Sequence, residues 1–416
     1  MQQYGEMRKK RQILSFLLAM SGCLAADRSD SELKSLFAAQ SWFKLRDAVA
    51  RSADAPAFYR GAVACAFNRV DEAERRFRAV IAAPGDVQHA ADAHGMLAYA
   101  YMRTGRYRRT YAHFAAIQKL NPGVPGIKSV VGVSSALSGY PEMSAKARRL
   151  STVRMSDDLF IPVAVDGKPA QYGFDSGSDV SIMSEAEANR LGLPIHAVSA
   201  STSQDEASGN DVPIRFVVVN RLTAGGFELR HVAFLVFRND AMPFVELPPD
   251  KQGILGIPVL VAFGTMRWNS GHELTIGAHA DRRDLQPPNM CFHAVRPVVE
   301  GGFRGQRIQV WLDTGSDRTF LTERFARQFP DVIEAGGKEA PARFRGVGGS
   351  NDVRVVTVPE VKFSFAGGEM ILHPALALPK DERVDRGWYD VWLGMDVLGQ
   401  AREVSLDFKS LTFSLK

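Results

Sequence analysis

Two short segments of this sequence place an aspartate in the same local setting. Asp175 is followed by Ser-Gly-Ser and Asp313 by Thr-Gly-Ser, and an apolar run comes directly before each aspartate. A carboxylate can take a proton from water, and a protonated carboxyl can give one to a carbonyl oxygen. Two carboxyl groups held side by side with one shared proton can therefore carry out both halves of a hydrolysis.

The repeat extends beyond these two turns. The aspartates are 138 residues apart (313 − 175), and the same offset relates Ile254-Leu255-Gly256 to Trp392-Leu393-Gly394 (394 − 256). It also relates Asn269 to Asp407. One Asp-X-Gly-Ser alone is most simply a capped turn, a common use of Asp and Gly. Two copies in register with further landmarks indicate a duplicated unit of short apolar strands.

The duplicated unit resembles the retropepsin-like aspartic proteases, from about residue 155 to residue 416. In that family each half presents Asp-Thr/Ser-Gly at a turn after an apolar strand, and a later apolar-apolar-Gly segment threads beside it. Both parts occur in both halves here. The resemblance implies two β-barrel-like halves, related by a pseudo-twofold axis, fused in one mainly β, bilobal protease.

The resemblance also implies a role for each turn residue. Asp175 and Asp313 would be the catalytic pair, one acting as base toward water and the other carrying the proton. The expected supporting residues of the two turns are Ser176, Gly177, Ser178, Thr314, Gly315, Ser316, Gly256 and Gly394. The hydroxyl groups of Ser176 and Thr314, the first in each turn, would bond to the opposing half and hold the two turns together. The second, from Ser178 and Ser316, would donate to the outer carboxylate oxygens and keep the pH optimum on the acid side.

A glycine-rich segment in each half is the expected flap. Gly346, Val347, Gly348 and Gly349 resemble the flap tip of retroviral proteases, and the weaker counterpart in the first half contains Ser208 and Gly209. Such a lid would open for an extended peptide and close over it, so these residues are the expected substrate-binding ones.

The region before the β units is predicted to be helical. Between about residues 31 and 150 apolar residues recur at helical spacing, and two segments are self-similar. The second one, from Leu97 to Pro122, is near the spacing of the tetratricopeptide signature, which this region resembles. Such a domain would either bind a protein partner or act as a structural cap on the β units, and a generic array of helical hairpins would give a similar pattern.

The N-terminus has the order of a secretory signal. The basic run Arg8-Lys9-Lys10-Arg11 precedes an apolar stretch and small residues that end at Ala26. We expect export to the periplasm or outside the cell. Lipidation of Cys23 is the second interpretation, and a hydrophobic N-terminal helix of a cytoplasmic protein is the third. Beyond this segment only Cys65 and Cys291 remain, so no disulfide scaffold is expected.

Composition and absent motifs exclude several other classes. The chain has 416 residues, 45% of them hydrophobic, which indicates folded domains. Its net charge of +5 is small for this length and does not suggest nucleic-acid binding. No phosphate-binding loop, Gly-X-Ser-X-Gly elbow of serine hydrolases or His-Glu-X-X-His motif occurs in the sequence. We therefore expect no metal ion and no organic cofactor.

These observations predict a multidomain aspartic endopeptidase. The expected segments are a signal at 1–26, a tetratricopeptide-like domain at 31–150, and protease halves at 151–284 and 285–416. Its partner would be a peptide or protein substrate, with a further protein partner on the helices and membrane contact only through a lipid on Cys23. The alternative is a non-catalytic peptide-binding or scaffold protein that acts through its helical domain.

Overall fold

The computed structural model describes residues 30–83, 85–146, 150–156, 158–204, 210–277, 287–378 and 387–416. The expected signal segment and Cys23 lie outside these ranges, and so does the expected boundary of the two halves at residues 284 and 285. Within the described ranges no helix is long and apolar enough to cross a membrane.

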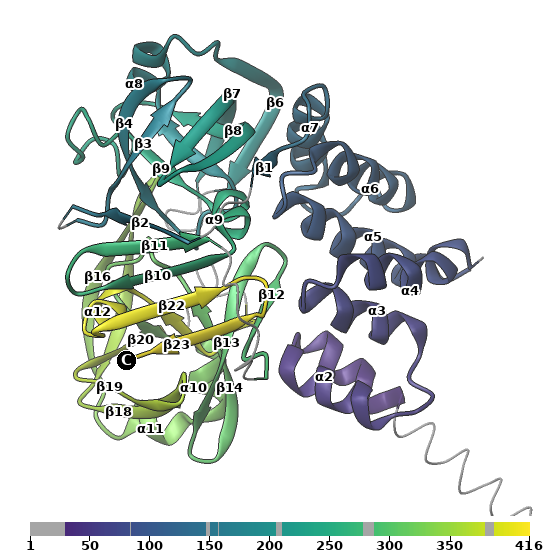
Figure 1. The fold of residues 1–416 in the computed structure, drawn as a ribbon. Helices are drawn as coiled ribbons and strands as arrows, with labels where there is room; N and C mark the ends of the chain where they lie inside the picture. Colours follow the sequence, from purple (N-terminus) through teal and green to yellow (C-terminus); the bar gives the residue numbers. More distant parts are fainter. Residues whose placement is uncertain are drawn as a thin grey trace, which may run out of the picture.

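The N-terminal region is a column of antiparallel helices beside the β part (Figure 1). After helical residues 30–38 it consists of α2 (Trp42–Arg51), α3 (Ala57–Ala66), α4 (Val70–Ala82), α5 (Val87–Met102), α6 (Tyr107–Leu120) and α7 (Ile127–Ser138). Gly61 shows why small residues recur in it. A Cβ atom at Gly61 would lie 2.6 Å from the Phe77 ring, so only glycine lets this aromatic side chain fill the gap between α3 and α4.

The chain leaves the helical region earlier than the sequence predicts. Residues 144–146 are not helical: they form β1 (Ser144–Lys146), which pairs with the edge of β8 (Phe227–Phe237). Gly139 and Pro141 follow α7 directly, and proline cannot continue a helix. The unpaired backbone groups at the edge of β8 then bind the extended chain.

The first half is one closed sheet in the order β1-β8-β5-β9-β4-β3-β7-β6, and β7 also pairs with β8. Its other strands are β3 (Ile161–Val165), β4 (Lys168–Phe174), β5 (Ser181–Ser184), β6 (His196–Gln204), β7 (Asp211–Ala224) and β9 (Gly253–Leu255). The short helices α8 (Glu185–Leu191) and α9 (Ile257–Phe263) follow β5 and β9.

The second half repeats this plan, with the path β16-β17-β20-β15-β21-β14-β13-β18-β19 and with β12 paired to β13. Its strands are β12 (Met290–His293), β13 (Arg296–Phe303), β14 (Gln306–Leu312), β15 (Phe320–Leu321), β16 (Lys338–Gly346), β17 (Gly349–Val358), β18 (Val361–Phe365), β19 (Gly368–Leu372), β20 (Ala375–Ala377) and β21 (Val391–Leu393). Its helices are α10 (Glu323–Gln328), α11 (Pro330–Glu334) and α12 (Met395–Leu398).

A third sheet joins the halves. It runs in the order β2 (Ser151–Arg154), β11 (Glu273–Gly277), β10 (Thr265–Asn269), β22 (Glu403–Asp407) and β23 (Thr412–Leu415). In the antiparallel pair at its centre Arg267 faces Ser405, and these two residues have the 138-residue offset of the repeat (405 − 267). The pseudo-twofold axis therefore passes through this pair of strands (Figure 1).

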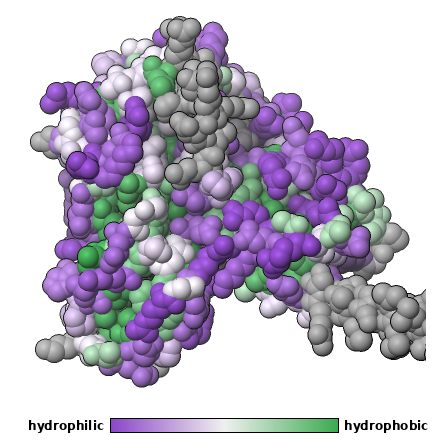
Figure 2. Space-filling view, turned by 60° about the horizontal axis from the view of Figure 1, so that its bottom comes forward, coloured by the Kyte–Doolittle hydropathy of each residue, from purple (hydrophilic) through white to green (hydrophobic). Residues whose placement is uncertain are grey.

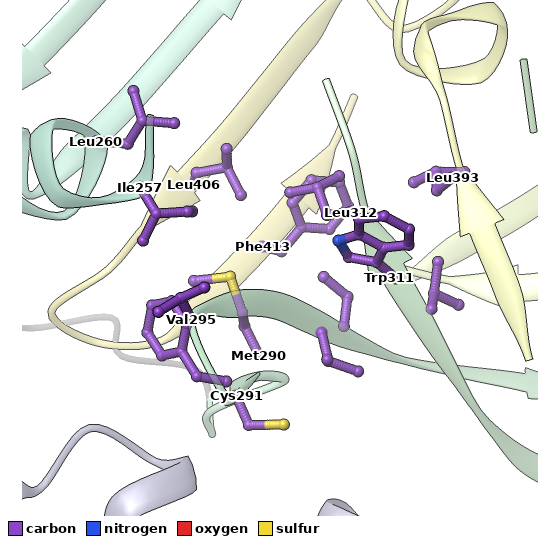
Figure 3. Packing of buried hydrophobic residues seen from close by; sticks show 14 of the residues in the cluster. Ile257, Leu260, Met290, Cys291, Val295, Trp311, Leu312, Leu393, Leu406 and Phe413 are labelled. Atoms are coloured by element: carbon purple, nitrogen blue, oxygen red, sulfur yellow. The ribbon is translucent and has the colours of Figure 1, made fainter. Parts of the chain in front are cut away.

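Apolar side chains from both halves form one continuous core. Figure 3 shows Ile257 and Leu260 of α9 on the same side of the core as Leu406 and Met290 of the second half, and all four are at most 1% exposed. The shared core means that the two halves fold as one unit.

On the surface, hydrophobic residues gather on the face of the β part at the left of Figure 2, bordered by hydrophilic ones.

The helical column is bonded to the second half through buried polar groups. The Trp42 amide donates to Oε1 of Gln309 at 2.8 Å, in a buried bond. The Arg103 guanidinium is 1% exposed and donates to the Ala294 carbonyl at 2.7 Å and to the Cys65 carbonyl at 2.6 Å. A buried cation is costly unless it is fully hydrogen-bonded, so Arg103 ties the two parts together.

Candidate active site

The two aspartates stand at matching turns, where parallel strand pairs end. Asp175 follows β4, which pairs with β9, and Asp313 follows β14, which pairs with β21. The Asp175 amide donates to the Leu255 carbonyl at 2.9 Å, and the Asp313 amide donates to the Leu393 carbonyl at 3.0 Å. Each aspartate is thus fixed by the apolar-apolar-Gly segment of its own half.

Gly256 and Gly394 allow this close approach. A Cβ atom at Gly256 would lie 2.6 Å from the backbone of Val180, and one at Gly394 would lie 2.5 Å from the carbonyl oxygen of Arg318. The contacts are equivalent, since Arg318 and Val180 are again 138 residues apart. Any side chain at either glycine would push the segment away from the turn that carries the aspartate.

The fold brings the two turns face to face. A Cβ atom at Gly177 would lie 2.4 Å from Oδ1 of Asp313, and one at Gly315 would lie 2.5 Å from Cγ of Asp175. Each carboxyl group therefore packs against the glycine of the opposite turn, and the two carboxyl groups lie within hydrogen-bonding range of each other. Each also accepts the amide of its own glycine, at 2.7 Å for Asp175 and 2.9 Å for Asp313.

The hydroxyl groups of Ser176 and Thr314 cross from one half to the other. The Ser176 amide donates to Oγ1 of Thr314 and the Thr314 amide donates to Oγ of Ser176, both at 3.0 Å. Each hydroxyl then donates to a carbonyl of the other half, Ser176 to Leu312 at 2.8 Å and Thr314 to Phe174 at 3.2 Å. These four buried bonds fix the separation of the aspartates, because neither turn can move without leaving polar groups unpaired.

The expected role of Ser178 and Ser316 is wrong. Ser178 donates its hydroxyl hydrogen to the Val180 carbonyl at 2.7 Å, and Ser316 donates to the Arg318 carbonyl at 2.8 Å. A hydroxyl has one hydrogen to donate, so neither can also donate to a carboxylate. These serines close their own turns, and the nearby carbonyl is the acceptor because it lies only two residues along the chain.

Trp392 is a residue of the site that the motif analysis did not single out. In the sequence it is one residue of the apolar-apolar-Gly segment, yet its indole Nε1 donates to Oδ2 of Asp313 at 2.7 Å in a buried bond. The signal was present in the sequence, since Trp392 stands at the position that Ile254 occupies in the first half. A donor side chain in one copy of a repeat marks a point where the two copies differ in chemistry.

Both carboxyl groups of the pair are biased toward the neutral form. Burial raises the pKa of Asp175 above its usual value. Burial and the adjacent charge of Asp175 raise the pKa of Asp313 well above its usual value. Two such groups in contact cannot both ionise easily, so the pair retains one proton to a higher pH than isolated aspartates would. This arrangement supplies a carboxylate and a carboxylic acid at the same place.

The expected second flap is a hairpin of β16 and β17 with Gly346 paired to Gly349 and Val347-Gly348 at its tip. The Phe344 ring of this hairpin stacks on Trp392 at 5.6 Å, so the hairpin lies next to the pair of aspartates. In the first half β6 and β7 form the corresponding hairpin, but Ser208 and Gly209 lie outside the described residues.

The two hairpins meet each other. Nδ2 of Asn210 donates to the carbonyl oxygen of Gly348 at 2.9 Å, and these residues again have the 138-residue offset. Arg345 of the second hairpin also forms a 2.6 Å ion pair with Glu246 of the first half. The hairpins are thus joined across the pseudo-twofold axis.

Comparisons with known proteins agree with the duplication. The family model for aspartyl protease matches the chain twice, at residues 161–259 and 299–397, and the matches are offset by 138 residues (299 − 161) and each contain one aspartate turn. The two β halves are therefore similar to aspartyl proteases. No curated protein matches the chain. Among solved structures, the crystal structure of a retropepsin-like aspartic protease from Rickettsia conorii shows 14% identity over 33% of this chain and 95% of that chain, with a TM-score of 0.22.

Proposed function

We propose that the protein is an aspartic endopeptidase in which Asp175 and Asp313 together hydrolyse peptide bonds. The single observation that carries this proposal is the contact of the two carboxyl groups, each packed on the glycine of the opposite turn. The repeated match to the aspartyl protease family supports it.

The proposed reaction uses one proton shared by the pair. The ionised aspartate accepts a proton from a water molecule as that water attacks the peptide carbonyl carbon, and the protonated aspartate donates to the carbonyl oxygen. The bonds between Ser176 and Thr314 hold the carboxyl groups at a fixed separation, which lowers the cost of ordering them during the reaction. The two hairpins would cover an extended substrate and exclude bulk water.

The test is hydrolysis of a denatured protein between about pH 3 and pH 8, the range in which a shared proton between carboxyls is gained and lost. We expect a bell-shaped rate profile centred on the acid side of neutrality, and inhibition by a statine compound such as pepstatin. Stoichiometric binding of the statine with no cleavage of any substrate would instead support the alternative, a non-catalytic peptide-binding protein.

We further propose that the helical column is tetratricopeptide-like. The contact of Gly61 with Phe77 supports this interpretation, because that family pairs small residues with aromatic ones between adjacent helices. The proposed role of the column is either to bind a protein partner or to cap the protease halves.

Export, with cleavage after the small residues that end at Ala26, is proposed from the N-terminal sequence. A lipid on Cys23 is the alternative. Mass spectrometry of the mature N-terminus distinguishes a free residue at about position 26 or 27 from a lipidated Cys23.

A further inference from the structure

Trp392 makes the two halves of the site chemically unequal. Its indole donates to Oδ2 of Asp313 at 2.7 Å, whereas Ile254 at the matching position of the first half has no hydrogen to donate. An indole N–H is a donor only, and a carboxylate is a stronger acceptor than a neutral carboxyl group. The bond therefore distinguishes the ionised form of Asp313 from its neutral form.

The indole is held in place by other rings. Trp392 stacks on Trp311 of β14, with ring centroids 5.0 Å apart, and on Phe344 of the second hairpin, 5.6 Å away. The Phe320 ring lies 5.7 Å away. Trp392 is 7% exposed, so its N–H cannot turn to water without breaking these contacts.

We propose that Trp392 is a positioning residue that places the negative charge of the singly ionised pair on Asp313 and the proton on Asp175. The position of the charge is inferred from the hydrogen bonds to Asp313 and from the charged groups near Asp175. Its consequence, that Asp313 is the base toward water and Asp175 the acid, rests on the proposed function.

Burial favours the opposite placement, and the hydrogen bonds must outweigh it. Asp313 is 6% exposed while Asp175 is partly exposed, and burial disfavours the charged form. In this desolvated site, however, Asp313 accepts the Gly315 amide on Oδ1 and the indole on Oδ2. Hydrogen bonds to a charged acceptor are stronger in a medium of low dielectric constant.

The surrounding charges favour the same placement as the indole. The side chain of Asp179 lies near Asp175, and its negative charge adds to burial in raising the pKa of Asp175. Asp179 is itself paired with Arg296 at 3.3 Å. Arg296 also lies over Trp311, 5.1 Å from the ring centroid, and the rings packed on Trp392 carry no charge.

The test is a titration of the pair in Trp392→Phe, which keeps an aromatic ring but loses the donor. A coupled pair ionises in two steps with two apparent pKa values. If the first ionisation places the charge on Asp313, loss of the bond should raise the first apparent pKa by about one pH unit and leave the second unchanged. The measurement is the pH dependence of carboxyl ¹³C resonances in aspartate-labelled protein, assigned with Asp175→Asn and Asp313→Asn.

The matched control is Trp388→Phe, which makes the same exchange at another buried tryptophan of the second half, one whose ring packs on His293 and Tyr389. It should move neither pKa. A rise in the second apparent pKa alone in Trp392→Phe would overturn the proposal, since the charge would then reside first on Asp175. No shift in either step, or an equal shift in the control, would overturn it too.

A measurement on the unaltered protein needs no variant to fold. The indole ¹H–¹⁵N resonance of Trp392 should move at the first ionisation step and change little at the second, and movement only at the second step would contradict the proposal. Both titrations are visible whether or not the protein cleaves peptides. The expected shifts without any hydrolysis would contradict the proposed function and leave the position of the charge standing.

Discussion

At the scale of single residues, the two turns show how one hydroxyl group can have different roles at neighbouring positions. Ser176 is buried and its hydroxyl bonds to the opposite half, whereas the hydroxyl of Ser178, two residues further on, bonds within its own turn. The difference arises from which carbonyl each hydroxyl can reach. Only the first hydroxyl of each turn faces the other half.

The double substitution Ser178→Ala with Ser316→Ala should therefore leave the pH optimum of hydrolysis where it is. Both hydroxyls donate to carbonyls and not to carboxylates, so their loss does not alter the balance between charged and neutral aspartate. The measurement is the cleavage rate against pH for the unaltered protein and the double variant. An upward move of the optimum would restore the role that the sequence assigned to these serines.

The raised pKa values of the pair also make a prediction about stability. Burial and the contact of the two carboxyl groups raise the pKa values of the pair, so the folded state binds more protons than the unfolded state does. Stability is therefore full at low pH and is lost as pH rises through the folded pKa values. Asp313→Asn cannot ionise. Its thermal midpoint, relative to that of the unaltered protein, should therefore be higher at pH 7 than at pH 4. Each pH unit of pKa shift corresponds to about 1.4 kcal/mol, and each kcal/mol moves the midpoint by about 2–4 °C.

Thermal unfolding at the two pH values measures this difference. Asp352→Asn is a useful control, because hydrogen bonding to Arg343 lowers the pKa of Asp352 and the sign of the effect should reverse. If the thermal midpoints of Asp313→Asn and of the unaltered protein differ by the same amount at both pH values, the pair has ordinary pKa values in the folded protein.

The pair of aspartates could be predicted from the sequence because the repeated motif fixes it. Two copies of Asp-X-Gly at the same offset from an apolar-apolar-Gly segment specify both turns at once. The bond from Trp392 to Asp313 could not be predicted, because it depends on the rotamer of a ring that Trp311 and Phe344 hold from other strands. The carbonyl groups that accept from the hydroxyls of Ser178 and Ser316 could not be predicted either, since the motif identifies the donor and not its acceptor.

At the scale of elements, the two hairpins that we expect to be flaps are supported differently. The base of the first hairpin rests on the end of α7. The hydroxyl oxygen of Tyr140, just after this helix, lies 3.0 Å from Nε2 of His196. The Tyr140 ring also contacts the Phe216 ring, with centroids 5.9 Å apart. The second hairpin is instead linked by the stack of Phe344 on Trp392 to β21, the strand that lies beside Asp313. The helical column therefore contacts one of the two hairpins that would cover a substrate.

The packing of α5 on α6 should weaken in acid. Burial, together with His94 and Arg109, lowers the pKa of His113 to about 4, and the His113 ring stacks on Tyr101. Because the folded pKa lies below the usual value of 6.5, the unfolded state binds the proton first, and stability is lost as pH falls from about 6.5 to about 4.

His113→Phe keeps a ring against Tyr101 and removes this titration. We expect the thermal midpoint to fall less between pH 7 and pH 5 in this variant than in the unaltered protein. His373→Phe, which alters a largely exposed histidine, should leave the loss unchanged. An undiminished loss in His113→Phe would show that other groups control the acid sensitivity.

Helical periodicity predicted the existence of the helices but not where the β part begins. The apolar spacing that indicates helices ends gradually, and β1 forms only because the edge of β8 is available to it. Tertiary context of this kind is not encoded in three residues. The strands of the two halves were easier to predict, since each is a short apolar run bounded by glycine and polar residues.

At the scale of the whole molecule, the helical column and the β halves share buried polar bonds and a strand. Because the duplicated unit has its own core, residues from about 151 onward would be expected to fold by themselves. The structure argues against this expectation. The bonds of Trp42 to Gln309 and of Arg103 to Ala294, and the pairing of β1 with β8, would all be lost with the helices.

Removal of residues up to 150 should therefore give a protein that is poorly soluble or unfolds without cooperativity. The truncation exposes apolar side chains such as Phe292, which is 1% exposed and lies under the Arg103 guanidinium. Circular dichroism during urea unfolding is the measurement. A soluble fragment with a sharp transition would show that the column is an independent domain.

The central claim is that one hydrolytic site is built from one carboxyl group of each half. The most direct measurement is the rate of cleavage of a denatured protein by Asp175→Asn and Asp313→Asn, each tested separately and each shown by circular dichroism to be folded. Because either change removes a titrating group from a pair that must share one proton, we predict that each lowers the rate by at least about 10²-fold. A folded single variant that retains full activity would contradict the shared site.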